Sequence, residues 1–419
     1  MVSTRIEVDY LLETHGEVQR VAEFMAGEQS SGTFVAIPGE TPELKERVAA
    51  QVTRLEILDH AVEGPSLPTR VKVESEARFK RAFITLSWPL DTLGPSLPNL
   101  LATIAGNLFE LGSVTGLRLL DIRLPDAFAA AYPGPQFGVQ GTRRLAGVEA
   151  RPIIGTIIKP SVGLGPDETA SLVNELCSAG IDFIKDDELQ SDGPACPFHL
   201  RVEKVMRVID THAQRSGKKV MFAFNLTGDL DQMRRRHDTL LRHGATCMMA
   251  SLNSVGLVGM IELARFGQLP IHAHRNGWGY LSRHPMLGWS YIAWQKIWRL
   301  AGADHMHVNG IGNKFAEEDS SCLASARACL APMFTEKPCV VMPVFSSAQA
   351  PRSAPATYQG LGSTDLIVTA GGGILAHPKG AAAGVEAMQQ AWQAAVAGVP
   401  LDDFARTRPN LRHALEMAA

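Results

Sequence analysis

The 419-residue sequence contains no uninterrupted apolar run of about 18 residues, so it predicts no membrane-spanning helix. Its first residues, MVSTRIEVDYLLETHGE, lack the pattern of a signal peptide. The net charge of −3 gives no electrostatic reason to expect nucleic acid or an anionic membrane as partner. The six cysteines are scattered without a Cys-x-x-Cys pair, which favours reduced thiols over disulfides or a zinc site. We therefore expect a cytoplasmic protein that binds neither nucleic acid nor membrane.

The first ~130 residues mix strand-like and helical patterns, as in an α+β domain. The strand-like stretches are TRIEVDYLLE, GTFVAIPG, TRLEILDHAV, FKRAFITLSWPL and LRLLDIRLP, and LPNLLATIAGNLFEL has the apolar face of a helix. Residues 126–147 are rich in Pro and Gly and are expected to connect this domain to the next. We predict a smaller N-terminal α+β domain with a ferredoxin-like fold at residues 1–133 and a second domain at residues 134–419.

In the second domain, short apolar runs alternate with longer amphipathic stretches, several of which end in Gly. The runs are PIIGTIIK, GIDFIK, KVMFAFNLT, TCMMASL, LPIHAHR, DHMHVN, CVVMPVFS and DLIVTA. Eight β-then-α units in about 240 residues fit a closed (β/α)8 TIM barrel, with a doubly wound open sheet as the alternative. A barrel would place the chemistry at the C-terminal ends of its strands, where polar residues follow nearly every run.

The second run ends in KDDE, one lysine followed by three acids. Asp187 and Glu188 would offer carboxylate oxygens to a hard divalent cation at the mouth of the barrel. Two carboxylates are too few ligands, and a lysine beside them is normally a cation that repels the metal. Lys185 could become a ligand only by carbamylation with carbon dioxide, which turns its amine into an oxygen-bearing anion. The alternative is a solvated acidic turn, and we expect Asp186 to lie outside the site.

Glycine, histidine and arginine residues at other run ends indicate an anionic ligand. The run DLIVTA precedes Gly371, Gly372 and Gly373, whose backbone N–H groups could hold a phosphate, although a flexible turn has the same pattern. HAHR and HMH each place two histidines on one face, and Arg275 can form a fork to phosphate or carboxylate. Zinc binding by the histidine pairs is the alternative, and the hard carboxylates nearby argue against it.

Two lysines are further candidates. Lys159 ends the first run, where desolvation and nearby cations would lower its pKa and suit an acid/base group. A lysine that reaches out to solvent is the alternative. Lys314 lies in the Gly-bearing loop NGIGNKFAEED, which can fold over a ligand and present the lysine, whereas a plain surface lysine would need no such role.

These motifs, in this order, resemble the large subunit of ribulose-bisphosphate carboxylase/oxygenase (RuBisCO) and its superfamily. The stretches that carry the resemblance are GTIIKPSVGL, GIDFIKDDE, HAHR, GADHMHVNGIGNK, PVFSS and TAGGGILAHPKG, with GEQSSGTF and LLATIAGNLF in the smaller domain. The resemblance implies magnesium held by carbamylated Lys185, Asp187 and Glu188, with carbon dioxide supplying the carbamate.

The resemblance also implies roles for the other candidates. Lys159 matches the catalytic lysine beside the substrate carbonyl, His274 an active-site histidine and Lys314 the mobile-loop lysine. The matched substrate contacts are Arg275 and His307 at one phosphate, Gly372 and Gly373, next to Gly371, at the second phosphate, and Ser346 at a substrate hydroxyl. Glu28, Thr33 and Asn107 match residues that reach the site from a neighbouring subunit, which implies a homodimer or a larger oligomer.

The sequence also departs from the carboxylases. Ser161 replaces a second lysine, Phe34 a tryptophan beside Thr33, and Trp278 a histidine. After the seventh run, SSAQAPRSAP stands where carboxylases have SGGIHVWHMP. These changes resemble the RuBisCO-like (form IV) branch of the superfamily, which does not fix carbon.

Within that branch, the retained lysines, Asn107 and metal residues favour chemistry close to carboxylation run backwards. We therefore expect magnesium-dependent removal of a carboxyl group from a phosphorylated keto-sugar acid through an enediolate, by a decarboxylase or transcarboxylase/hydrolase of the 3-oxo-isoapionate 4-phosphate type. The alternatives are the methionine-salvage enolase, against which Asn107 argues, an isomerase of methylthioribulose phosphate, and ribulose-bisphosphate carboxylation itself. A sugar-phosphate-binding protein without catalysis and a zinc hydrolase are the remaining hypotheses.

Overall fold

The computed structural model describes residues 4–32, 37–58, 61–70 and 78–417, so Thr33 and Phe34 lie outside the described residues. The chain forms two compact units. The N-terminal unit combines residues 1–133 with residues 277–300, and the barrel unit combines residues 134–276 with residues 301–419. The domain boundary after residue 133 stays a prediction. No helix in the described ranges has the length and apolar character needed to cross a membrane.

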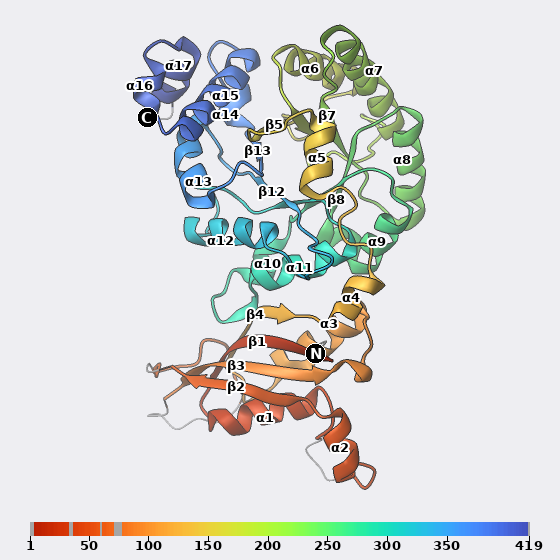
Figure 1. Cartoon of the computed structure of the whole chain (residues 1–419), viewed down its shortest axis with the longest axis vertical. Helices are drawn as coiled ribbons and strands as arrows, with labels where there is room; N and C mark the ends of the chain where they lie inside the picture. The colour runs from red at the N-terminus through yellow and green to blue at the C-terminus, as the bar shows by residue number, and fades with distance from the viewer. Residues whose placement is uncertain (1–3, 33–36, 59–60, 71–77, 418–419) are drawn as a thin grey trace. The chain divides into compact units, whose positions relative to one another are not determined.

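The N-terminal unit is built on a mixed sheet with the strand order β10-β4-β1-β3-β2. Figure 1 labels β4, β1, β3 and β2 of this sheet. Its strands are β1 (Arg5–Thr14), β2 (Gln51–Ile57), β3 (Lys80–Pro89), β4 (Gly116–Arg123) and β10 (Leu287–Trp289). Its helices are α1 (Val18–Glu28), α2 (Pro42–Val48), α3 (Leu97–Ala105), α4 (Asp126–Ala131), α10 (Trp278–Ser282) and α11 (Tyr291–Ala301), the last of which ends one residue inside the barrel unit. Alternate residues of β1 are buried because successive side chains of a strand point to opposite faces.

Strand β10 was missed by the sequence analysis, which assigned its residues to the barrel domain. It pairs in parallel with β4, from Leu287 opposite Leu117 to Trp289 opposite Leu119. Only three residues form this strand, and they contain a glycine with a φ of 88°. Such a stretch is too short to show the alternation by which a strand is recognised in sequence.

In the described part of the barrel unit, eight parallel strands close into a barrel in the order β11-β12-β13-β5-β6-β7-β8-β9. They are β5 (Ile153–Ile157), β6 (Phe183–Lys185), β7 (Met221–Asn225), β8 (Cys247–Ser251), β9 (Ile271–His274), β11 (His305–His307), β12 (Met342–Phe345) and β13 (Ile367–Thr369). Each strand falls inside one of the eight apolar runs, which confirms the (β/α)8 TIM barrel and excludes the open sheet. The runs are mostly apolar and do not alternate with polar residues as half-buried strands do, because barrel strands are covered on both faces.

Helices surround these strands (Figure 1). They are α5 (Gly138–Ala146), α6 (Pro166–Ser178), α7 (Phe198–Ser216), α8 (Leu230–Arg242), α9 (Leu252–Phe266), α12 (Asp319–Leu330), α13 (Ala354–Leu361), α14 (Gly372–Leu375), α15 (Ala381–Ala397), α16 (Leu401–Ala405) and α17 (Pro409–Met417). The segment expected to be a Pro- and Gly-rich connection is largely helical, because it contains α4 and α5. Its Gly147 ends α5 in the left-handed conformation, at a φ of 63°, as a helix stop rather than as part of a flexible linker.

Candidate active site at the C-terminal ends of the barrel strands

Lys185 is the last residue of β6 and is 1% exposed. In the barrel register it lies between Ile157 of β5 and Ala223 of β7. The strand therefore carries the lysine into the barrel mouth with apolar neighbours on both sides. Asp187 and Glu188 follow in the loop after β6, where the chemistry of a barrel is normally found.

The residues predicted from KDDE meet the other predicted acid/base groups in one place. The Lys159 ammonium lies 2.6 Å from Oδ2 of Asp187, and the Lys185 ammonium lies 3.5 Å from Oε2 of Glu188. Nε2 of His274 lies 3.4 Å from the same Glu188 oxygen. These five residues are called the lysine–carboxylate cluster below. Lys159 reaches it from two residues beyond the end of β5, and His274 reaches it from the end of β9.

Burial decides the protonation of this cluster. Desolvation lowers the pKa of Lys185 below its ordinary value, although the charges of Glu188 and Asp187 oppose the shift. Burial also lowers the pKa of His274, to about 4, with the charge of Lys185 acting in the same direction. Burial raises the pKa of Glu188, but the positive charges of His274 and Lys185 outweigh it and bring that pKa to about 2. At neutral pH the cluster therefore holds an ionised Glu188, a neutral His274 and a lysine amine that loses its proton readily.

This donor set fits a magnesium ion once Lys185 contributes an oxygen. Magnesium prefers oxygen ligands, and Asp187 and Glu188 supply two carboxylates on adjacent residues. Within the described ranges, no group of three or more His, Cys, Asp and Glu side chains gathers that could hold a metal. A third anionic ligand for magnesium would therefore have to be of another residue type. The buried Lys185 amine, close to both acids and easily deprotonated, is suited to react with carbon dioxide.

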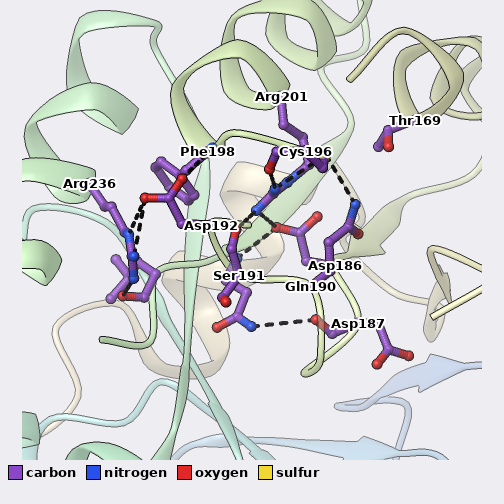
Figure 2. A network of polar contacts seen from close by, with 12 residues as sticks. Thr169, Asp186, Asp187, Gln190, Ser191, Asp192, Cys196, Phe198, Arg201 and Arg236 are labelled. Carbon is purple, nitrogen blue, oxygen red and sulfur yellow. Dashed lines mark hydrogen bonds and ion pairs between the residues drawn. The ribbon is translucent and has the colours of Figure 1, made fainter. Parts of the chain in front are cut away.

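Arg201 of α7 anchors the loop that carries Asp187 and Glu188 (Figure 2). Asp186 and Arg201 are both fully buried, and Nη2 of Arg201 lies 3.1 Å from Oδ2 of Asp186. The same guanidinium donates to the carbonyl of Ser191 at 2.7 Å and to that of Cys196 at 3.1 Å. Asp186 therefore points away from the cluster and anchors the loop to a helix.

Asn225, the last residue of β7, supports the same loop from the neighbouring strand. Its backbone N–H donates to Oδ2 of Asp186 at 2.9 Å, and its side-chain amide donates to the carbonyl of Glu188 at 3.1 Å. Arg201 and Asn225 together fix the loop on both sides, which keeps the two carboxylates where the lysines reach them.

The predicted phosphate-binding Arg275 pairs with a carboxylate that the sequence analysis did not select. Nη2 of Arg275 lies 2.5 Å from Oε2 of Glu317, and that oxygen also accepts from Nδ2 of Asn309 at 2.7 Å. Arg275 is 7% exposed. An anion that binds Arg275 would therefore compete with Glu317.

His307 and Ser346, two of the expected substrate contacts, lie next to each other. Nδ1 of His307, the last residue of β11, lies 3.1 Å from Oγ of Ser346, the first residue after β12. The His307 ring also lies near that of His274, with 4.4 Å between the ring centroids. The histidine pairs thus face one another across neighbouring strands.

The glycine turn after β13 also reaches the cluster. A Cβ atom on Gly371 would lie 3.9 Å from Cε of Lys159, so the turn and the lysine are neighbours. A Cβ atom on Gly373 would lie 2.2 Å from the carbonyl oxygen of Gln349, which excludes any side chain there. Gly372 has open space instead. Its environment leaves room for a ligand beside the backbone.

The remaining predicted residues lie elsewhere. Lys314 is exposed, with its ammonium 5.4 Å from the centroid of the Phe315 ring, and no hydrogen bond or ion pair within the described ranges joins it to the lysine–carboxylate cluster. In the N-terminal unit, Nδ2 of Asn107 donates to Oε1 of Glu28 at 3.2 Å, so these two residues meet each other. Thr33 lies outside the described residues.

Four residues that the sequence analysis did not select support the site: Ser161, Arg201, Asn225 and Glu317. Asn225 carried a signal, because it is a polar residue at the end of an apolar run. Ser161 accepts a hydrogen bond from the Lys159 ammonium at 2.7 Å, and its sequence signal was its place two residues after that lysine. The sequence contains no signal for Arg201 or Glu317, because their partners are set by tertiary packing.

Comparison with known proteins agrees with this geometry. Family models of the ribulose bisphosphate carboxylase large chain match at residues 138–418 for the catalytic domain and at residues 10–128 for the N-terminal domain. A 3-oxo-isoapionate-4-phosphate transcarboxylase/hydrolase of Xanthobacter autotrophicus is 59% identical, over 99% of both chains. A 3-oxo-isoapionate-4-phosphate decarboxylase of Rhizobium rhizogenes is 46% identical, over 97% of this chain and 96% of the relative.

A solved structure is also similar. The crystal structure of a RuBisCO-like protein from Burkholderia fungorum matches with a TM-score of 0.93 and 47% identity, over 99% of this chain and 100% of that chain. Both family models, the relatives and this structure cover the N-terminal unit as well as the barrel. The chain therefore belongs to the RuBisCO large-chain family.

Proposed function

We propose that the protein is an enzyme that breaks the bond between a carboxyl group and its neighbouring carbon in a phosphorylated keto-sugar acid. The substrate class is that of 3-oxo-isoapionate 4-phosphate. The 59% identity to a transcarboxylase/hydrolase of this compound, over nearly the whole of both chains, supports this assignment. The lysine–carboxylate cluster is the observation that carries it, because it supplies both an acid/base lysine and a set of oxygen ligands.

Carbamylated Lys185, Asp187 and Glu188 would hold magnesium. When bound, magnesium supplies a Lewis acid that stabilises negative charge developing on substrate oxygens. This chain's residues then have distinct tasks. Arg201 and Asn225 hold the loop of Asp187 and Glu188 in place. Preorganisation of this kind is effective because no reorganisation is needed during the reaction.

Lys159 is placed to move the proton. Its ammonium lies between Asp187 and Ser161, at 2.6 and 2.7 Å, so its Nζ is held by two acceptors beside the cluster. When the carboxyl group leaves as carbon dioxide, both electrons of the broken bond stay on the substrate as an enediolate. In a decarboxylase, Lys159 would then deliver a proton to the carbon that lost the carboxyl group, whereas in a transcarboxylase/hydrolase another carbon of the enediolate would take up the carbon dioxide. The turn at Gly371–Gly373, or the guanidinium of Arg275, would hold the phosphate and thereby orient the substrate.

A decarboxylase is the second candidate, supported by the 46% identity to the Rhizobium enzyme. The two reactions differ in the fate of the carboxyl carbon. Decarboxylation releases it as carbon dioxide, whereas a transcarboxylase/hydrolase keeps it in an organic acid. The higher identity to the transcarboxylase/hydrolase favours the second outcome.

A labelling experiment decides between them. 3-Oxo-isoapionate 4-phosphate labelled with ¹³C in its carboxyl group is incubated with enzyme and magnesium, and the products are followed by NMR. Label in a non-volatile acid supports the transcarboxylase/hydrolase, and label in bicarbonate supports the decarboxylase. Unchanged substrate would contradict the proposal. The Lys185→Ala variant is the control, and magnesium-dependent turnover by it would contradict the role given to the carbamate.

We also propose that the working unit is at least a homodimer whose sites use Glu28, Thr33 and Asn107 of a neighbouring subunit. The contact between Asn107 and Glu28 supports a shared task for these two residues. Mixing inactive Asn107→Ala and Lys185→Ala proteins tests this. Random pairing in a dimer would restore about a quarter of the sites, because half of the dimers would contain one intact site. No recovery after proven subunit exchange would contradict the shared site.

A further inference from the structure

Three buried histidines link two hydroxyl groups across the inside of the barrel. Oγ1 of Thr142 in α5 lies 2.8 Å from Nε2 of His305, and Nδ1 of His305 lies 3.3 Å from Nδ1 of His272. Nε2 of His272 lies 2.7 Å from Nε2 of His307, whose Nδ1 lies 3.1 Å from Oγ of Ser346. This histidine row therefore runs from Thr142 to Ser346 without a gap.

The hydroxyl of Thr142 fixes which nitrogen of His305 donates and which accepts, and this sets the direction of the hydrogen bonds along the row. The Thr142 hydroxyl has one proton, and it donates this proton to the carbonyl of Gly138, one helical turn earlier, at 2.5 Å. Toward His305 the hydroxyl can then only accept, so Nε2 of His305 must carry a proton. A neutral imidazole has one N–H and one acceptor nitrogen. Nδ1 of His305 is therefore an acceptor.

The donor and acceptor in each following hydrogen bond of the row are fixed by the bond before it. Nδ1 of His272 must donate to His305, which leaves Nε2 of His272 as an acceptor. Nε2 of His307 must then donate to His272, which leaves Nδ1 of His307 as an acceptor. At the end of the row, the Ser346 hydroxyl donates its only proton to His307. Thr142 and each of the three histidines donate one hydrogen bond and accept one, whereas Ser346 donates one to His307.

Burial keeps the three rings neutral, so each has one N–H and one acceptor nitrogen. His272 and His305 are 0% exposed and His307 is 3% exposed. Desolvation lowers the pKa of all three, that of His305 to about 3. The described contacts between them join ring nitrogen to ring nitrogen, with no carboxylate in the row to favour a charged form.

We propose that Thr142 sets the direction of the histidine row, so that Ser346 donates to His307 and offers only its lone pairs to the substrate. Thr142 is thus a positioning residue, which acts through the histidines. Ser346 selects for a substrate group that donates a hydrogen bond, such as a hydroxyl, and against a carbonyl oxygen or a phosphate oxygen at that point. The direction of the row stands independently of the proposed function, whereas the selection by Ser346 rests on it.

The direction is tested by ¹⁵N NMR of the histidine side chains in the unliganded full-length protein at neutral pH. Signals are assigned by their loss in single His→Gln variants. We expect the proton on Nε2 of His305, on Nδ1 of His272 and on Nε2 of His307. Any other tautomer at one of these three positions would overturn the proposal. This measurement needs no variant of Thr142 and no substrate, so it stands even if the proposed function fails.

The role of Thr142 is tested by a matched pair of variants. Thr142→Ser keeps the hydroxyl, and we expect unchanged tautomers. Thr142→Val has a similar shape without the hydroxyl, and we expect a second tautomer to become populated at His305 and His307. With the labelled substrate, Thr142→Val should raise KM about tenfold while Thr142→Ser stays within about twofold, as expected for one misdirected hydrogen bond. Unchanged tautomers in Thr142→Val would overturn the role of Thr142.

Discussion

Nζ of Lys159 lies 2.6 Å from Oδ2 of Asp187, so a lysine that follows β5 and an acid that follows β6 meet at the mouth of the barrel. A purely structural pair would need no third partner. Here the same ammonium also contacts the hydroxyl of Ser161 at 2.7 Å. Two groups, one from each of two neighbouring loops, thus fix one proton donor, and one of them, Asp187, is itself a candidate metal ligand.

Replacing this donor should separate binding from chemistry. We expect Lys159→Met to lower kcat by at least about 100-fold, because general acid–base groups typically contribute 10²–10⁴-fold. Magnesium binding, measured by calorimetry in the presence of bicarbonate, should persist in this variant. Ser161→Ala is the milder partner variant and should lower kcat by no more than about tenfold, because it removes one hydrogen bond. Normal turnover by Lys159→Met would contradict its role in proton transfer.

The buried pair of Asp186 and Arg201 should be costly to break. Arg201→Met leaves Asp186 buried without its partner, and we expect it to lower the free energy of unfolding by about 3–5 kcal/mol. Arg207→Met is the matched control, because Arg207 lies on the same helix and forms an exposed pair with Glu203. That control should cost about 0–1 kcal/mol. Urea unfolding measures both, and equal effects would contradict the anchoring of the loop by Arg201.

The buried histidines predict a loss of stability in acid. Burial lowers the pKa of His305 to about 3, whereas in the unfolded chain it is near 6.5. Between these values the unfolded state binds more protons, so stability is fully present above pH 6.5 and is lost as the pH falls. His305 alone should cost about 1 kcal/mol between pH 7.5 and pH 5.5.

Urea unfolding at these two pH values checks this prediction. His305→Gln cannot take up the proton, so its loss of stability between them should be smaller than that of the original protein by this amount. Equal losses in the two proteins would show that His305 does not titrate on unfolding.

Two neighbouring glycines should respond differently to alanine. Gly373→Ala places a methyl group against the backbone of Gln349, and we expect a loss of about 1–3 kcal/mol from overpacking. Gly372→Ala has open space, so its free energy of unfolding should change by less than about 0.5 kcal/mol. If the turn holds the substrate phosphate, Gly372→Ala should nevertheless raise KM. An unchanged KM would place the phosphate elsewhere, with Arg275 as the other proposed site.

The barrel could be predicted from the sequence because its strands are buried on both faces. Each strand is therefore a short apolar run, and the polar residue that follows it, such as Lys185 at the end of β6, marks the face where the chemistry lies. Arg201 could not be predicted in this way, because nothing in the sequence of its helix shows which loop its guanidinium will reach. The contact of Arg275 with Glu317 could not be predicted either, because the sequence does not show which side chains tertiary packing will bring together.

Other features escaped because local composition was ambiguous. Residues 126–147 contain the Pro and Gly of a linker, yet α4 and α5 form there, and Thr142 of α5 reaches into the barrel to contact His305. A single threonine in a supposed connection gives no sign of this contact. The resemblance to a known family predicted the members of the lysine–carboxylate cluster, while their pairing required the structure.

Strand β10 has a consequence for the order in which the protein can be completed during synthesis. The sheet of the N-terminal unit acquires its edge strand only from residues 287–289, which leave the ribosome after strands β5 to β9. Until then β4 has an unpaired edge, and such edges are sites of unwanted association between chains. A fragment that ends at residue 133 would keep that edge exposed permanently. The N-terminal unit, which is synthesised first, can therefore be completed only after most of the barrel unit has left the ribosome.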